Sequence, residues 1–318
     1  MSAIPPPADA AAGHDADRHA GLSAEAERLR ANRAGIGFMV AAMACFVCND
    51  ALVKYASQSM PAAQLIFVRG LMTIAWIVLV ARATGSSIRP MAVFHRPVAT
   101  RSAFDAAATF AYLLSLFQMP IGNAIAINMA SPLFIALLAV LVLRERVGPG
   151  QWAAMLVGFG GVLLLGRPTA DGFNAFALLC LAGALLHALR DLTVRRIPAE
   201  VSSATITLST AFAVMVIAGL VTGLQGWQPF GGFEFGLLAG ASLFLAAAYH
   251  LLILATRKGE LSAVAPFRYS ALLIALTIGW VVWGEMPDAI GWTGIGLLIG
   301  AGLYFLRRQP RRRPAHKP

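Results

Sequence analysis

The sequence predicts an all-α integral membrane protein of ten transmembrane helices, arranged as two inverted five-helix repeats. Three observations predict this fold class: an apolar composition, ten apolar segments long enough to cross a bilayer, and a similarity between the two halves of the chain. Of the 318 residues, 58% are hydrophobic and 13% are charged, and the mean hydropathy is +0.71. A soluble domain has about 25% charged residues, so this much apolar surface indicates a lipid environment.

Residues 1–34 precede the first apolar segment and are rich in Pro, Ala and charged side chains. Because they have no apolar core, they are expected to form a disordered cytoplasmic tail. The segments that follow approach the ~20 residues needed for a bilayer crossing. The predicted spans are 35–55, 61–82, 97–117, 121–143 and 148–166 in a first repeat (35–166), and 172–193, 203–223, 232–255, 261–284 and 289–306 in a second (172–306), followed by a basic cytoplasmic tail (307–318).

The two halves resemble each other in sequence. "LRERVGPGQWAAMLVGFGGVLLL" (143–165) aligns with "WGEMPDAIGWTGIGLLIGAGLYF" (283–305) at an offset of 140, which pairs Glu145 with Glu285. A repeat of this length contains five helices. Because five is odd, the second copy must cross the membrane in the opposite direction, a plan typical of secondary transporters.

The positive residues predict the orientation. With ten crossings and a cytoplasmic N-terminus, 21 of the 25 Lys and Arg residues lie in or next to the two tails and the cytoplasmic loops. The four others are Lys54, Arg69, Arg167 and Arg268. Such a bias is the signature of cytoplasmic loops. We therefore expect a multi-pass protein of the inner (plasma) membrane with both termini in the cytoplasm.

Three segments carry a resemblance to a known family. They are "NDALVKYASQSMPAAQLIFVRG" (49–70), "ASPLFIALLAVLVLRERVGPGQW" (130–152) and "AVAPFRYSALLIALTIGWVVWGEMPDAIGWTGIGLLIGAGLYF" (263–305). The chain resembles the drug/metabolite transporter superfamily, in its EamA-type branch, over roughly 35–306. The resemblance implies a ten-helix secondary carrier, an exporter or exchanger of small polar or amphipathic metabolites such as amino acids or nucleoside-like compounds. It also implies that no cofactor or metal is needed, and a monomer or weak homodimer is expected.

Other function classes find less support in the sequence. The net charge of +10 is distributed in clusters between apolar runs, which does not resemble a nucleic-acid-binding face. An intramembrane lipid-modifying enzyme is the first alternative, but only "HALRD" (187–191) resembles such a site. A membrane scaffold or receptor is the second, although it would have no use for deeply placed charged residues. We therefore predict that the protein is not an enzyme and has no catalytic residues.

Charged residues inside the spans are the first candidates for a substrate site, because they are costly in hydrocarbon. Asp50 and Arg69 enter from the outer side, at depths of about 9 and about 12 Å. They predict either an ion pair or a shared ligand site. Lys54 is four residues from Asp50, so a local pair is possible, but its position near the outer end favours a structural, snorkelling side chain.

Asp105 and Arg268 enter from the inner side, each at a depth of about 11–12 Å. Asp105 has Arg101 one turn before it, so an Arg101–Asp105 pair and an Asp105–Arg268 pair are both open. Pro266 predicts a kink just before Arg268, since proline removes a helical hydrogen bond. We expect Arg268 to face a central cavity and to bind an anionic or π-rich part of the substrate.

Tyrosine and asparagine complete the candidate site. Tyr112 and Tyr249 occupy related positions at an offset of 137, and either substrate stacking or helix packing is compatible with them. The seven predicted substrate-binding residues are Asp50, Arg69, Tyr112, Asn128, Tyr249, Arg268 and Tyr269. The predicted partners are a small-molecule substrate, the lipid bilayer and a coupling ion, with a proton on Asp50 or Glu145 as one candidate. His187 is expected to pack by a hydrogen bond, with a proton relay as the alternative.

Overall fold

A computed structural model of the chain describes residues 8–83, 85, 95–141, 148–166, 174–194, 197–198 and 201–308. All regular structure in these residues is helical. The elements are α1 (Ala8–Ala56), α2 (Ala62–Ala83), α3 (Arg96–Gln118), α4 (Ile121–Asn128), α5 (Ser131–Leu141), α6 (Pro149–Gly166), α7 (Ala175–Val194), α8 (Ser203–Gln225), α9 (Gly232–Lys258), α10 (Leu261–Val264), the 3-10 helix η2 (Ala265–Tyr269), α11 (Ser270–Trp283) and α12 (Ala289–Arg308).

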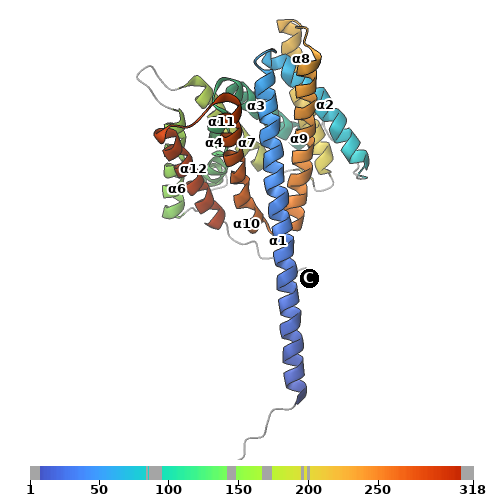
Figure 1. Cartoon of the computed structure of the whole chain (residues 1–318), viewed down its shortest axis with the longest axis vertical. Coiled ribbons are helices and arrows are strands. Elements are labelled where there is room, and N and C mark those ends of the chain that lie inside the picture. The colour runs from blue at the N-terminus through green and yellow to red at the C-terminus, as the bar shows by residue number, and fades with distance from the viewer. Residues whose placement is uncertain are drawn as a thin grey trace, which may run out of the picture.

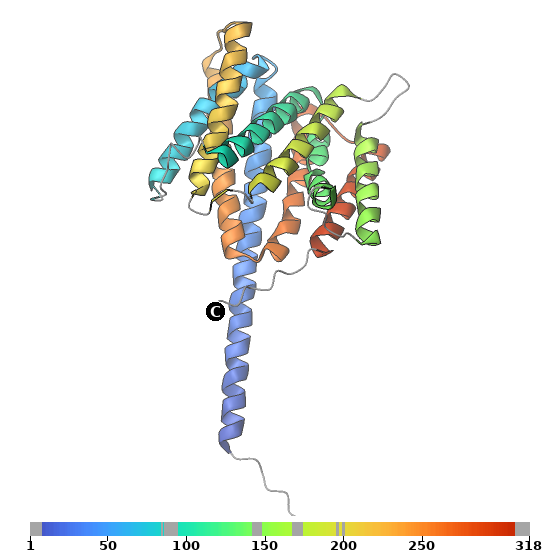
Figure 2. The same cartoon turned by 180° about the vertical axis from the view of Figure 1, so that it is seen from behind.

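The first helix is longer than the sequence predicts. α1 begins at Ala8, and its N-terminal part projects from one end of the bundle (Figure 1 and Figure 2). The disordered tail predicted for residues 1–34 is therefore wrong for residues 8–34, while residues 1–7 lie outside the described part. The physical reason is composition: Ala, Glu, Leu and Arg favour helix. A helix already formed in the membrane also extends outward without a new nucleation step.

Helices lie at all ten predicted spans, but they differ in how well they suit a bilayer. Within the described residues, seven helical segments are long and apolar enough to cross a membrane, and two shorter apolar helices correspond to α6 and α12. α3 has 23 residues and carries Arg96, Arg101 and Asp105, which lower its hydropathy. The chain is thus an all-helical membrane protein.

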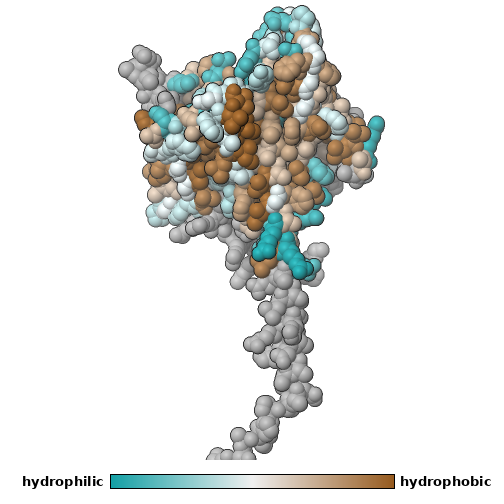
Figure 3. Space-filling view, in the orientation of Figure 1, coloured by the Kyte–Doolittle hydropathy of each residue, from teal (hydrophilic) through white to brown (hydrophobic). Residues whose placement is uncertain are grey.

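The outer surface of the bundle is apolar, as a lipid-facing surface must be. Leucine and valine side chains such as Leu156, Leu220, Leu273 and Val281 expose more than half of their area. Figure 3 shows apolar residues over most of one face, with polar residues mainly at the upper rim and where α1 leaves the bundle. In water such a surface would cause aggregation, whereas in a bilayer it is solvated by lipid chains.

The contacts between the two halves of the chain are symmetric. α1 packs along α9, and α3 packs along α7; α2 contacts α9, and α3 contacts α8. Three further pairs join helices at equal positions in the two halves, namely α2 with α8, α4 with α11, and α6 with α12. If each helix of the first half is exchanged for the helix five spans later, every one of these pairs maps onto another of them.

The fourth span of each half is broken. α4 ends at Asn128, and a turn at 129–130 separates it from α5. In the second half, η2 interrupts the helix between α10 and α11, so the disturbance predicted at Pro266 is confirmed. At the sequence offset of 140, residues 129–130 correspond to 269–270, so the first break falls at the C-terminal end of η2. In a membrane, such breaks are tolerated where they line protein or water.

Candidate functional site

A cavity of about 550 Å³ lies inside the bundle, and both helix breaks border it. The predicted site residues Asp50, Arg69, Tyr112, Asn128, Tyr249, Arg268 and Tyr269 all line it. They come from α1, α2, α3, α4, α9 and η2, so both halves of the chain contribute. A second hollow of about 540 Å³ between the ends of α2, α3 and α8 contains none of the seven.

The cavity reaches one end of the bundle. Its lining includes Arg101 near the start of α3, Asp191 near the end of α7, and Thr207 near the start of α8. These ends lie on the side from which α1 projects. Lys54 and Glu285, at the opposite end, are not part of the lining. The cavity therefore extends toward the end of the bundle from which α1 projects, and the end at Lys54 and Glu285, outside its lining, is called the closed end below.

One polar cluster surrounds Asp50. The Tyr112 hydroxyl donates to Asp50 Oδ2 at 2.6 Å, and the Asn49 amide donates to Asp50 Oδ1 at 2.9 Å. Arg69 donates to Asn49 Oδ1 at 3.3 Å and is only 6% exposed. The described residues contain no direct Asp50–Arg69 ion pair; Asn49 stands between the two groups. The predicted proximity of the two charges is correct, but their contact is indirect.

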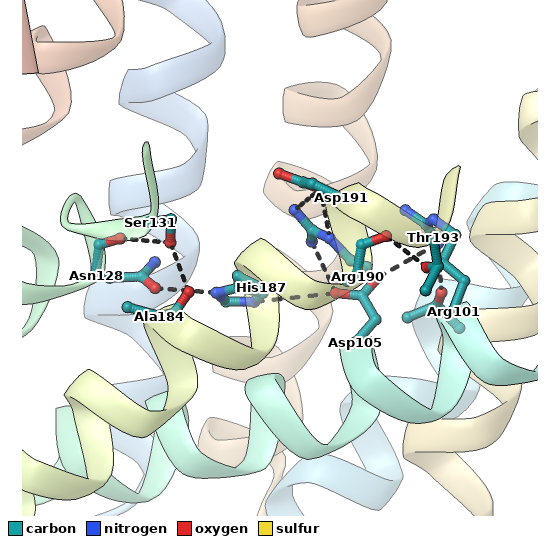
Figure 4. Close-up of polar contacts among 10 residues, drawn as sticks. Arg101, Asp105, Asn128, Ser131, Ala184, His187, Arg190, Asp191 and Thr193 are labelled. Carbon is teal, nitrogen blue, oxygen red and sulfur yellow. Dashed lines mark hydrogen bonds and ion pairs between the residues drawn. The ribbon is translucent and has the colours of Figure 1, made fainter. Parts of the chain in front are cut away.

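A second polar network surrounds Asp105 (Figure 4). Arg190 donates to Asp105 Oδ1 at 2.8 Å, and Arg101 lies 3.5 Å from Oδ2. Arg190 also pairs with Asp191 at 2.8 Å. The predicted Arg101–Asp105 pair is therefore present, whereas an Asp105–Arg268 pair is not found among the described residues. The buried Asp105 carboxylate is thus compensated by two arginines, whereas Asp191 is 41% exposed.

Sequence reasoning missed Arg190 as a cavity residue. The predicted span 172–193 contains Arg190, but the residue was counted only among the positive charges next to a cytoplasmic loop, whereas in the structure it lies on α7 and lines the cavity. The signal was present in "HALRD", where Arg190 stands beside Asp191 on a helix that also carries His187. An arginine next to an aspartate within an apolar segment indicates an internal ion pair more than a loop.

His187 links the inner network to the break in the fourth span. Its Nδ1 lies 3.0 Å from Asn128 Oδ1, and its Nε2 is 3.9 Å from Asp105 (Figure 4). Ser131, at the start of α5, donates to the backbone carbonyl of Asn128 at 2.9 Å. The break is thus held by side chains, and the predicted packing role of His187 agrees with its hydrogen bond.

Arg268 differs from the other cavity arginines. No described residue forms a hydrogen bond or ion pair with its guanidinium, although Asp191 is near enough to interact with it electrostatically. The side chain is exposed, and it borders the cavity. Tyr269 follows it, and Tyr249 lies in the same cavity with its ring edge-on to Phe46, at a centroid distance of 5.2 Å.

Lys54 lies at the closed end of the bundle and does not pair with Asp50 there. Its Nζ is 2.6 Å from Glu285 Oε1 and 2.9 Å from the Met119 carbonyl oxygen, and it lies over the Trp283 ring at 4.9 Å. The structural role predicted for Lys54 agrees with these contacts, whereas a local Asp50–Lys54 pair is not found among the described residues and the side chain is buried, so it does not snorkel. The reason is that Glu285, remote in sequence, supplies a nearer carboxylate. Its repeat partner Glu145 lies outside the described residues.

The chain is similar in sequence to known transporters. Residues 33–167 and 174–307 each match the EamA-like transporter family. A riboflavin transporter of Rhizobium johnstonii is 33% identical over 67% of this chain and 70% of its own length. An S-adenosylmethionine uptake transporter of Rickettsia bellii is 25% identical over 88% of this chain and 96% of its own. A pseudopaline exporter of Pseudomonas aeruginosa is 26% identical over 87% and 96%, respectively.

The fold also occurs among solved structures. One crystal structure has 19% sequence identity to this chain and a TM-score of 0.59. The match covers 84% of this chain and 94% of that chain. At this level of identity the likeness concerns the fold alone.

Proposed function

This chain belongs to the EamA-like transporter family, and from that premise we propose that it is a secondary carrier of a planar, acceptor-rich metabolite, with riboflavin as the first candidate. The carrier has ten transmembrane helices in two inverted repeats, 35–166 and 172–306, and both termini lie in the cytoplasm. Substrate binds in the cavity between the repeats. The open end of that cavity faces the cytoplasm.

Three observations support the inverted-repeat part of the proposal. When the helices of the two halves are exchanged, each of the contacting pairs described above maps onto a contacting pair. At the offset of the sequence repeat, the break at 129–130 falls at the end of η2 (Ala265–Tyr269). The family matches the chain twice, over two segments of similar length. Two antiparallel halves around a midplane site are a recurring plan of secondary transporters.

The unpaired Arg268 carries the substrate proposal. Its planar guanidinium has donors in a fork that fits two neighbouring acceptor atoms, and its flat face stacks on aromatic rings. The isoalloxazine ring of riboflavin offers two ring carbonyls at one edge and a broad π-face. Tyr249, Tyr269 and Phe46 supply aromatic surface in the same cavity. The hydroxyl groups of the ribityl chain are suited to the polar side chains around Asp50 or Asp105.

The charge balance of the cavity favours the same substrate chemistry. Four arginines and three aspartates line it: Arg69, Arg101, Arg190, Arg268, Asp50, Asp105 and Asp191. With all of them ionised, one positive charge is left over. Arg101 and Arg190 balance Asp105 and Asp191, and Arg69 balances Asp50 through Asn49. The surplus charge is therefore located at Arg268. A ligand with acceptor groups or negative charge compensates it, whereas a cationic ligand does not.

In this proposal, the concentration gradients of the transported solutes determine the direction of transport. The names of the relatives include both an uptake transporter and an exporter. Apart from the closed end of the cavity, the described residues show no feature that would restrict transport to one direction. We therefore propose exchange, in which a solute moves in either direction down its own gradient or in return for another solute.

Counterflow in proteoliposomes tests the proposal. Vesicles loaded with unlabelled riboflavin should take up labelled riboflavin transiently, and chromatography should recover it unchanged. Arg268→Lys should reduce the rate at low substrate by roughly tenfold to a hundredfold, because a charge-assisted hydrogen bond contributes about 1.5–3 kcal/mol. The matched control is Arg257→Lys, an exposed arginine outside the cavity lining.

Three results would contradict parts of the proposal. Absence of riboflavin counterflow by folded protein would exclude riboflavin, and labelled S-adenosylmethionine in the same vesicles would then test a cationic substrate class. Chemical conversion of the recovered label would favour the enzyme alternative. Full counterflow by Arg268→Ala would remove Arg268 from the substrate site.

A further inference from the structure

Asp50 differs from the other carboxylates that line the cavity. Asp105 and Asp191 each contact Arg190 at 2.8 Å. Asp50 instead accepts hydrogen bonds from two uncharged groups, the Tyr112 hydroxyl and the Asn49 amide. Among the cavity residues that the structure describes, no cation lies within ion-pair distance of it. Asp50 can therefore become neutral without breaking a direct ion pair.

Arg69 is the nearby cation, and its hydrogen bonding is incomplete. It donates from one terminal nitrogen to Asn49 Oδ1 at 3.3 Å. Its Nε is buried and has no hydrogen-bond partner among the described residues, and Arg69 is only 6% exposed. Arg69 also borders the cavity. An unsatisfied guanidinium in such a place is costly unless an acceptor approaches it.

We propose that Asp50 is the binding site of a coupling proton, and that proton binding there makes Arg69 available to the substrate. A proton from water on one side forms an O–H bond with a carboxylate oxygen of Asp50. The negative charge beside Arg69 disappears, and the cavity gains one positive charge that acceptor groups of the substrate compensate. Proton and substrate then bind together and cross in the same direction. This inference rests on the proposed carrier function.

The surroundings of Asp50 are compatible with both protonation states. The charged or titratable groups that face it are Tyr112 on α3 and Arg69 on α2, and Tyr249 on α9 interacts electrostatically with Arg69. A tyrosine hydroxyl both donates and accepts hydrogen bonds. Tyr112 can donate to the ionised carboxylate and accept from the protonated one. The pair at 2.6 Å is therefore kept in either state.

The first test needs no substrate. Purified protein in nanodiscs is compared at acidic and alkaline pH by infrared difference spectroscopy, which detects the carbonyl band of a protonated carboxyl group. The band should be present in wild type and in the control Asp191→Asn, and absent in Asp50→Asn. Tyr112→Phe should keep the band but move its midpoint pH. Persistence of the same band in Asp50→Asn would overturn the assignment.

The second test measures coupling. In vesicles with an alkaline interior, riboflavin should accumulate about tenfold per pH unit, the factor expected for one proton per substrate. Asp50→Asn should abolish this accumulation, and any counterflow that remains should no longer depend on pH. Accumulation equal to wild type by Asp50→Asn would overturn the inference. If wild type shows no riboflavin counterflow, the proposed substrate fails, and the infrared result still decides the role of Asp50.

Discussion

At the scale of single residues, Asp105 has the most demanding position in the cavity. Its side chain is 9% exposed, and it contacts Arg190 from α7 and Arg101 from its own helix. Arg101 also donates to the Thr210 hydroxyl on α8 at 3.1 Å. One carboxylate thus joins three helices. Removal of a partner from a buried ion pair strands the remaining charge, which costs more than the pair itself contributes.

Asp105→Asn should therefore destabilise the protein strongly. Two arginines would be left without their shared anion, and losses of about 3–5 kcal/mol are typical of broken buried pairs. Thermal unfolding in detergent, followed by fluorescence, should show a clearly lower midpoint. The matched control is Asp191→Asn, whose side chain is 41% exposed and whose pair should contribute no more than about 1 kcal/mol. Equal midpoints for the two variants would contradict this account of Asp105.

The lining of the site was predictable from sequence, but its pairing was not. A charged or hydroxyl-bearing residue in an apolar span is excluded from lipid, so it must face the bundle interior. This argument alone places Asp50, Arg69 and Arg268 in the cavity. The partner of Asp105 depends on the rotation of α3 against α7. Sequence spacing contains that information only for residues on the same helix, so Arg101 was found and Arg190 was missed.

At the scale of secondary-structure elements, the closed end of the cavity depends on one cluster. Glu285 accepts from Lys54 and also from the Ile121 backbone N–H, at 2.6 and 2.9 Å. Lys54 in turn donates to the Met119 carbonyl oxygen. The end of α1, the α3–α4 turn and the segment after α11 are joined at this point. Separation of these elements would open the cavity at that end.

Loss of this cluster should shift the carrier toward a state open on the outer side. In Glu285→Gln, the charge attraction to Lys54 is lost while the side-chain shape is kept. A cysteine introduced at the buried Met119 should then react faster with an impermeant thiol reagent applied from outside. Exchange of the two charges, in the Lys54→Glu and Glu285→Lys double variant, should slow the reaction again. An unchanged rate in Glu285→Gln would show that the ion pair does not close this end.

Close helix contact between α6 and α12 gives a second prediction at this scale. A Cβ atom added at Gly161 would lie 2.6 Å from the Gly294 carbonyl oxygen, and one at Gly294 would lie 2.7 Å from the Gly161 carbonyl oxygen. The two helices therefore touch through backbone. Gly160, adjacent in sequence, has open space at the corresponding position. The glycine pattern of the sequence alone does not identify which of the two adjacent glycines is in the contact.

Gly161→Leu should separate α6 from α12 and destabilise the fold by at least about 1–3 kcal/mol, as overpacking does. Gly160→Leu should be tolerated in the same unfolding measurement, since its side chain would point into open space. The two substitutions have equal effects on intrinsic helix propensity. A lower midpoint for Gly160→Leu than for Gly161→Leu would contradict the proposed contact.

At the scale of the whole molecule, the order of the helical segments could be predicted from the sequence, but the length of α1 could not. The number and sequence of helices follow from apolar segments and their breaks, because a bilayer requires hydrogen-bonded helices of fixed length. The extent of α1 does not, since no apolar pattern defines residues 8–34. The inverted arrangement also has consequences beyond helix count. It requires that all ten helices cross, including α3, α6 and α12, which are shorter or more polar than the rest.

Cysteine labelling tests the crossings of α3 and α6 directly. Gln58 follows α1 and Gln225 ends α8, and both are exposed. In a background with Cys45, Cys48 and Cys180 replaced by alanine, a cysteine at either position should react with an impermeant reagent from outside. Six crossings separate the two positions in the ten-helix arrangement, an even number. If either α3 or α6 failed to cross, the two cysteines would label from opposite sides. A control cysteine at Arg257 should react only after the membrane is permeabilised, and labelling of it from outside would reverse the proposed orientation.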